Sequence, residues 1–201
     1  HRPPQSVILP KRKKSEIYIP SSGEVEILLE AAKGTSIEIP IMFAAFCGLR
    51  RGEIAALTWD DVDLRKKEVH ITKAIGSSDH GLVVKSPKSY AGYRTVGIPD
   101  RLVLVLASLR SEGKPLIAIS INAFDKTFSR ALRGANLPHF RFHDLRHYFA
   151  SVLLTLGIPD MYVIKIIGHS STDMLKRTYQ HVMKEAEEGY LRKINEEFSV
   201  K

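Results

Sequence analysis

The 201-residue chain has a single cysteine and lacks any apolar run long enough to cross a bilayer. One thiol, Cys47, excludes an internal disulfide and favours a reducing, cytoplasmic setting. Because Cys47 ends the apolar stretch IPIMFAAFC, we expect it to be buried packing rather than a reactive group. A membrane span needs about 18 consecutive apolar residues, and no charged-then-apolar leader precedes the chain's first helix pattern. These absences favour a soluble protein with no membrane partner.

Several sequence motifs of enzymes are also missing. The eight histidines include no HExxH pattern, no cysteine pair accompanies them, and no acidic trio lies near them, so the spacing excludes the usual metal sites. No GxSxG motif of a serine hydrolase is present, and no GxxxxGK[ST] loop for ATP. We therefore expect no cofactor and no metal.

Positive charge is abundant. The chain holds 30 Lys and Arg against 22 Asp and Glu, a formal net charge of +8, which favours a polyanionic partner such as nucleic acid. Charge alone does not separate DNA from RNA or acidic lipid. Residues 1–18 combine three prolines with a basic cluster at 11–14 and are predicted to be an extended linker. A chain that begins at His1 instead of methionine is interpreted as a fragment or a processed product.

Hydrophobic periodicity predicts a mostly helical α+β domain with a small antiparallel three-stranded sheet. Ser21 and Glu24 have capping-box spacing, so a helix should run from there to about Lys33, and a second should pass through MFAAF. The three strands are expected at 68–75, 81–87 and 93–99. Further helices are expected at 101–110, 121–134, 144–156, 160–167 and 172–183, and an amphipathic tail helix at 184–201.

Two short segments bring anion-binding side chains together. In FRFHDLRHYF, His143 and Arg146 are three residues apart on one helical face and could grip one anion. A basic helix that simply faces solvent or the DNA backbone is equally compatible with this segment. In GLRRGEIAAL, Arg50 and Glu53 have i,i+3 spacing, at which the carboxylate could brace the guanidinium. Taken alone, this pair is better explained as a surface ion pair.

A third segment, IIGHSSTDMLKRTYQHV, contains a break between two helices at Gly168. In one straight helix, His169 and Tyr179 would lie about 15 Å apart, so the break is what could let both reach one ligand. The alternative for Tyr179 is a helix tyrosine that covers the core.

Together, in this order, GLRRGE, a hairpin lysine, HDLRH, GH and a tyrosine ten residues later resemble the tyrosine recombinase (phage integrase) family over residues 21–182. The resemblance implies the fold of that family's catalytic domain at 19–183, with residues 1–18 as a linker from a missing N-terminal DNA-binding domain. It implies two supporting residues, Glu53 and His147, and the catalytic set Arg50, Lys88, His143, Arg146, His169 and Tyr179.

Lys88 is the chosen lysine because it begins the turn KSYAGYR that leads into the last strand. Lys85 is the alternative, and Lys73 also lies near the predicted hairpins. The neighbouring Arg51 occupies a position that the family often fills with an apolar residue, so we expect it not to be catalytic.

The resemblance implies a metal- and ATP-independent reaction on double-stranded DNA. Two arginines and His169 would bind the non-bridging oxygens, and Tyr179 would attack phosphorus to give a 3′-phosphotyrosine. Lys88 would protonate the departing 5′ oxygen, with His143 as proton acceptor for the phenol. The implied role is integration or excision of a mobile element by a homo-tetramer on paired DNA sites, with accessory DNA-bending or directionality proteins. A type IB topoisomerase and a non-enzymatic DNA-binding module are the alternatives.

Overall fold

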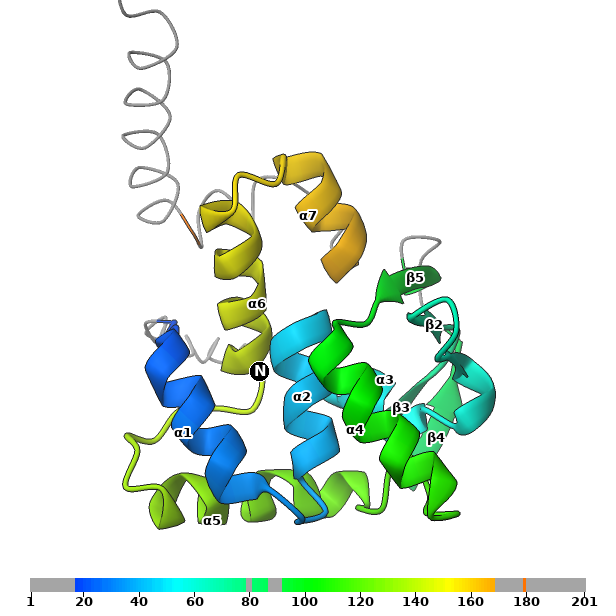
Figure 1. Cartoon of the computed structure of the whole chain (residues 1–201), viewed down its shortest axis with the longest axis horizontal. Helices are drawn as coiled ribbons and strands as arrows, with labels where there is room; N and C mark the ends of the chain where they lie inside the picture. Colours follow the sequence, from blue (N-terminus) through cyan, green and yellow to red (C-terminus); the bar gives the residue numbers. More distant parts are fainter. Residues whose placement is uncertain (1–16, 79–80, 87–91, 169–178, 180–201) are drawn as a thin grey trace, which may run out of the picture.

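The computed structural model describes residues 17–78, 81–86, 92–168 and 179 (Figure 1). Three of the predictions lie outside these residues: the basic cluster at 11–14, the tail helix at 184–201, and the helix at 172–183 apart from Tyr179. The two site residues Lys88 and His169 also lie outside them.

Helices make up most of the described chain. They are α1 (Ser22–Ala32), α2 (Glu38–Cys47), α3 (Arg51–Ala56), α4 (Asp100–Ser111), α5 (Phe124–Gly134), α6 (Asp144–Thr155) and α7 (Asp160–Ile167), with 3₁₀ turns η1 (Trp59–Asp61) and η3 (Ile121–Ala123). The capping box is confirmed at α1, because the Ser21 hydroxyl accepts from the Glu24 amide at 3.2 Å and the Glu24 carboxylate accepts from the Ser21 amide at 2.7 Å. The other predicted helices in the described residues are also found.

The predicted three-stranded antiparallel sheet is found, but not all of its strands are the predicted ones. A three-stranded antiparallel sheet has the order β1–β2–β5, formed by β1 (Val62–Asp63), β2 (Glu68–Ile71) and β5 (Arg94–Gly97). The segment predicted as its middle strand is β4 (Gly81–Lys85), which pairs with β3 (Ala74–Ser78) in a separate hairpin. The segment predicted as one strand at 68–75 contains β2 and the start of β3, which belong to different sheets. Because two residues separate β3 from β4, these strands are nearest neighbours along the chain and pair with each other.

The core surrounds α2. This helix is apolar on nearly every face and therefore has to be enclosed on all sides, as it is by α1, α3, α4 and α6 (Figure 1). Cys47, at its end, is fully buried, which confirms the packing role, and this burial raises the pKa of the thiol to about 12. Packing begins earlier than the predicted linker boundary, because the ring of Tyr18 stacks on Phe140.

A second, smaller core lies where α6 meets α7, on the side of the molecule away from α5 (Figure 1). It buries four aliphatic residues of these helices together with Tyr179: Ala150, Leu154, Val163, Ile167 and Tyr179. Within the described residues, no helix combines the length and apolarity needed to cross a membrane. The ends of α2, α3, β5 and α7 meet next to this second core, and the candidate site is built there.

Candidate functional site

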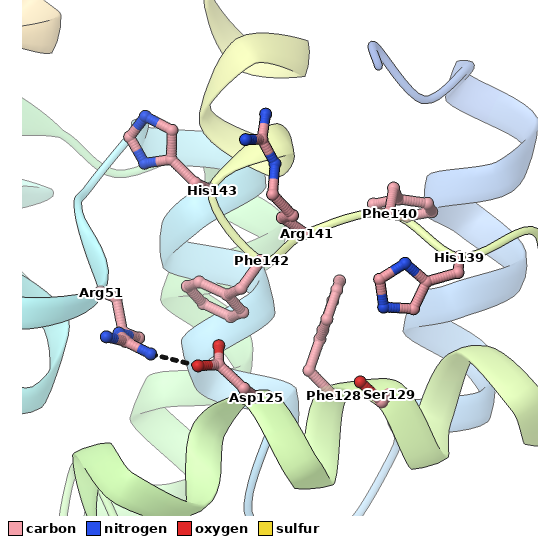
Figure 2. A pocket seen from close by; sticks show the side chains of 9 residues that line it. All are labelled: Arg51, Asp125, Phe128, Ser129, His139, Phe140, Arg141, Phe142 and His143. Atoms are coloured by element: carbon pink, nitrogen blue, oxygen red, sulfur yellow. Dashed lines mark hydrogen bonds and ion pairs between the residues drawn. The ribbon is translucent and has the colours of Figure 1, made fainter. Parts of the chain in front are cut away.

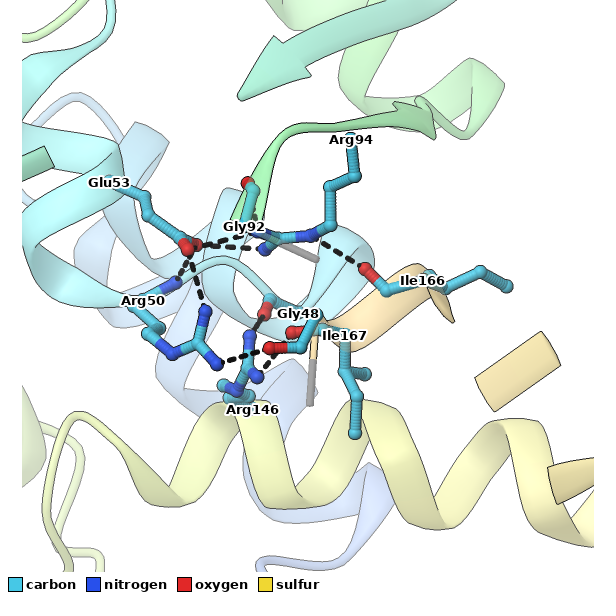
Figure 3. Close-up of polar contacts among 9 residues, drawn as sticks. Gly48, Arg50, Glu53, Gly92, Arg94, Arg146, Ile166 and Ile167 are labelled. Atoms are coloured by element: carbon cyan, nitrogen blue, oxygen red, sulfur yellow. Dashed lines mark hydrogen bonds and ion pairs between the residues drawn. The ribbon is translucent and has the colours of Figure 1, made fainter. Parts of the chain in front are cut away.

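The buried carboxylate of Glu53 accepts hydrogen bonds from two arginines, Arg50 and Arg94, which lie in different parts of the chain (Figure 3). Glu53, in the first turn of α3, is 5% exposed. Its Oε1 accepts from Arg50 Nη1 at 2.8 Å and from Arg94 Nη1 at 2.9 Å, and its Oε2 accepts from Arg94 Nη2 at 2.8 Å. Burial by itself raises the pKa of Glu53, but the Arg94 guanidinium, and after it Arg50, lowers that pKa to about 2. The carboxylate is therefore charged at any physiological pH.

Arg146, on α6, is the largest fully buried side chain among the described residues, and its charge acts on the neighbouring Arg50 and Glu53. Its guanidinium donates to the carbonyls of Gly48, at 2.5 Å, and of Ile167. Gly48 ends α2 with φ 65°, and a Cβ there would lie 2.4 Å from the Phe149 ring, so glycine is what allows α2 to end against α6. Desolvation, followed by the positive charge of Arg50, lowers the pKa of Arg146 to about 9, so it remains a cation at neutral pH.

The C-terminal end of α7 accepts one hydrogen bond from each of three arginines. Ile166 O accepts from Arg94 Nε at 2.8 Å and Gly168 O from Arg50 Nη2 at 2.6 Å, while Ile167 O, between them, accepts from Arg146. The last carbonyls of a helix have no partner inside the helix and form the negative end of its dipole. Three guanidinium groups from three elements therefore converge on consecutive carbonyls, which directly precede His169 in the sequence (Figure 3).

Tyr179 contacts a histidine on α6. Its hydroxyl lies 2.6 Å from Nδ1 of His147, and the ring of His143 packs edge-on against that of His147 with centroids 5.0 Å apart. Burial of the 4% exposed Tyr179 raises the pKa of its phenol, so the group is neutral here. Desolvation lowers the pKa of His147. Desolvation, followed by the charges of His147 and Arg146, lowers the pKa of His143, so both rings are neutral at pH 7 and able to accept a proton.

The residue that meets the phenol differs from our prediction. We predicted His143 as the proton acceptor and His147 as a supporting residue, but it is His147 that touches Tyr179. His143 is exposed and lines a pocket of about 450 Å³ (Figure 2). Arg51 forms an ion pair with Asp125, and both residues line the same pocket as His143 (Figure 2).

Six of the eight predicted site residues lie in the described part of the chain and form two groups. Arg50, Glu53 and Arg146 lie at the end of α7, and His143 and His147 lie with Tyr179, which shares the second core with Ile167 of α7. Of the three candidate lysines, Lys73 forms an ion pair with Asp61 at 2.8 Å, and Lys85 lies at the end of β4. Sequence reasoning missed Arg94, because its partner Glu53 is 41 positions away and no local spacing joins them. In the described residues, no group of three or more potential metal ligands gathers.

Comparison with known proteins identifies the family. Residues 21–186 match the model of the phage integrase family, so the chain belongs to this family, and its fold is that of a tyrosine recombinase catalytic domain. A XerC-like tyrosine recombinase of Caldanaerobacter subterraneus is 28% identical over 92% of this chain and 56% of that protein. The chain thus spans about half the length of the curated relatives it matches.

Two solved structures share this fold. The integrase of transposon Tn1549, in complex with circular intermediate DNA, has a TM-score of 0.75 and is 17% identical, over 90% of this chain and 68% of that one. A lambda integrase dimer bound to a COC′ core site has a TM-score of 0.58 and is 19% identical, over 83% of this chain and 49% of that one.

Proposed function

We propose that this chain is the catalytic part of a site-specific DNA recombinase, which cleaves and rejoins double-stranded DNA through a 3′-phosphotyrosine. The observation that carries the proposal is the convergence of three residues from separate segments: Arg50 and Arg146 donate to the last carbonyls of α7, and Tyr179 shares the second core with Ile167 of that helix. Family membership supports it, as do the names of the relatives, which are recombinases and integrases. Integration or excision of a mobile element is the biological role that fits those names.

The arginines would stabilise the charge that builds on the non-bridging oxygens of the phosphate. Arg50 is suited to this because its side chain is 38% exposed while Glu53 holds its Nη1 in place. A bound phosphate would compete with the carbonyls of Ile167 and Gly168 for the donors of Arg146 and Arg50. Removal of one such preorganised donor from an oxyanion site costs roughly 10²–10³ in rate.

The phenol would lose its proton to a neighbouring imidazole as it attacks phosphorus. A neutral tyrosine is a weak nucleophile, and burial raises the pKa of Tyr179 further, so a base is needed. His147 is in contact with the hydroxyl, and His143 lies beside it with its ring open to the pocket. The covalent bond to DNA would conserve the energy of the broken phosphodiester, so that rejoining needs neither ATP nor a metal.

Lys88 and His169 complete the proposed site on the strength of the sequence. Lys88 would protonate the departing 5′ oxygen, and His169 would bind a phosphate oxygen beside Arg50 and Arg146. His169 directly follows the three carbonyls that the arginines cap. Lys88 lies six residues before Arg94, which begins β5.

Double-stranded DNA is the proposed substrate, and strand exchange would take place between copies of the protein on paired sites. The Tn1549 integrase structure is a complex with circular intermediate DNA, and the lambda integrase structure is a dimer bound to a core site. Assembly into a tetramer and the involvement of accessory DNA-bending or directionality proteins extend this proposal. So does the division of the chain into a linker at 1–18, a catalytic domain at 19–183 and a tail at 184–201 that packs on a neighbouring subunit.

The test is covalent capture of DNA. The 201-residue chain is incubated with a pool of nicked duplexes of randomised central sequence, in which cleavage releases a short strand and prevents rejoining. Covalent complexes are then isolated and their DNA is sequenced. Wild-type protein should yield a common recovered duplex, and Tyr179→Phe should yield none. An adduct formed by Tyr179→Phe refutes the proposal, and relaxation of supercoiled DNA that lacks any recovered site would favour a topoisomerase instead.

A further inference from the structure

Arg94 is a buried arginine that joins three parts of the site. It begins β5, and its side chain is 4% exposed. Its two Nη atoms bind both oxygens of Glu53 in α3, its Nε donates to Ile166 O in α7 at 2.8 Å, and its Nη1 also lies 3.4 Å from Gly92 O. In Figure 3 its guanidinium lies between the Glu53 carboxylate and the end of α7.

This geometry depends on the shape of a guanidinium. A planar fork can bind both oxygens of a carboxylate at once and still direct Nε to a third acceptor. Glu53 in turn accepts from the Nη1 of Arg50 and from its backbone amide, the latter at 2.8 Å. The orientation of Arg50 therefore depends on a carboxylate whose own position is fixed by Arg94, although 41 residues separate the two along the chain.

We propose that Arg94 is a positioning residue for DNA cleavage: it holds Glu53 so that Glu53 directs Arg50 toward the phosphate, and it ties the end of α7 to that unit. This role rests on the proposed function, because it supposes that Arg50 binds the scissile phosphate. Arg94 does not touch DNA itself, since its side chain is buried among Glu53 and the main chain of α7. Its loss should therefore slow the reaction step much more than it weakens DNA binding.

The pKa of Glu53 distinguishes a positioning role for Arg94 from mere support of the fold. The charged groups that face Glu53 are Arg94 from β5, Arg50 from the start of α3 and Arg146 from α6. Without Arg94, burial would dominate more strongly and the pKa of Glu53 would rise from about 2. Glu53 would then become protonated at mildly acidic pH and lose its hold on Arg50, which wild-type protein retains down to far lower pH.

The experiment compares Arg94→Ala, Arg94→Lys, Glu53→Gln and the double variant Arg94→Ala/Glu53→Gln. Adduct formation on the recovered nicked duplex is timed under single-turnover conditions from pH 4.5 to 8, and affinity for the same duplex is measured by fluorescence anisotropy. Leu106→Ala serves as a control, because it opens the buried core at α4 without touching the site. Arg101→Ala serves as a second control, because it removes an exposed Arg–Glu pair between α4 and α1.

Arg94→Ala should lower the adduct rate on the order of 10²-fold, as expected when a reacting group is misplaced by about 1 Å, with little change in affinity. The acid limb of its rate profile should move up by about one pH unit or more relative to wild type. In the double variant, which has no carboxyl to titrate, that displacement should disappear, and the rate should fall no further than in the worse single variant. Arg94→Lys, whose ammonium is a compact charge without a planar fork, should have an adduct rate between those of wild type and Arg94→Ala.

Arg94→Ala with a wild-type rate, or a slow Arg94→Ala with an unmoved pH profile like that of Leu106→Ala, overturns the positioning role. So does an Arg94→Lys variant as fast as wild type, because the bidentate fork would then be unnecessary. Failure of the proposed function gives a different result from failure of the positioning role. In that case, wild-type protein forms no adduct, or Tyr179→Phe forms one, and the Arg94 variants are not needed to see it.

Discussion

The contact between Tyr179 and His147 leads to a test of which histidine accepts the phenol's proton. The hydroxyl lies 2.6 Å from His147 Nδ1, whereas the ring of His143 packs edge-on against that of His147. We expect His147→Phe, which keeps an aromatic ring in the half-buried space, to remove the base while largely preserving the packing. General base catalysis is typically worth 10²–10⁴-fold, so the adduct rate at pH 7 should fall by about that factor.

The pH dependence of the adduct rate identifies the base more clearly than the rate at a single pH. Because its pKa is lowered, His147 is neutral at pH 7 and able to act as a base. The wild-type adduct rate should therefore be nearly constant between pH 7 and 8 and fall only at lower pH. Without the base, only the phenolate reacts. Because the pKa of Tyr179 is raised by burial, the rate of His147→Phe should climb roughly tenfold per pH unit up to pH 9.

The assay is single-turnover adduct formation on the recovered nicked duplex, with His143→Phe measured in parallel. His143 is exposed in the pocket, so its loss should slow the reaction without giving the steep pH dependence. Free imidazole should partly restore His147→Ala and leave His143→Phe unchanged. If the steep profile belongs to His143→Phe instead, the contact in this structure is not the reactive one and the original prediction of His143 as base is correct.

Three further outcomes are expected. Lys88→Ala should cleave ordinary DNA poorly but recover on a 5′-bridging phosphorothiolate, whose sulfur leaves without a proton, and recovery by Lys85→Ala instead would reassign the lysine. Gly48→Ala should lower the free energy of unfolding by roughly 2 kcal/mol or more, measured by urea titration, because alanine is strained at φ 65° and its Cβ would collide with Phe149. Glu53 has a folded pKa of about 2, below its unfolded value near 4.3, so its contribution to stability is present above pH 4.3 and lost as pH falls toward 2; Glu53→Gln should flatten that part of the curve.

Local patterns in the sequence predict local structure well in this chain. The Ser21 capping box and the Arg50–Glu53 pair both join residues three apart, so one turn of helix determines their geometry. The apolar surroundings of Cys47 likewise predicted its burial. The alternative of an ordinary surface ion pair for Arg50 and Glu53 is wrong, because Glu53 is buried beside a second arginine.

The rest of the site depends on contacts that no local pattern encodes. Arg94 meets Glu53 across 41 residues, and Tyr179 meets His147 across 32. Arg146 binds backbone carbonyls, which every residue carries, so its partners leave no mark in the sequence. The small three-stranded antiparallel sheet was predicted correctly, but the strands that form it were not, for a related reason. Alternation located the segments of β2, β4 and β5, but it did not separate β2 from β3 or find β1. Pairing is decided by chain connection and packing, so 81–85 pairs with its immediate neighbour instead of β5.

The carbonyls at the end of α7 supply acceptors for the arginines of the proposed phosphate site. A buried guanidinium with no acceptor would be strongly destabilising, and no buried side-chain nitrogen or oxygen in the described residues lacks a partner. Carbonyl oxygens at a helix C-terminus carry partial negative charge, as non-bridging phosphate oxygens carry a larger one. In the proposed reaction, Arg50 and Arg146 would exchange one kind of acceptor for the other, while Arg94 would remain bound to Glu53 and to Ile166 O.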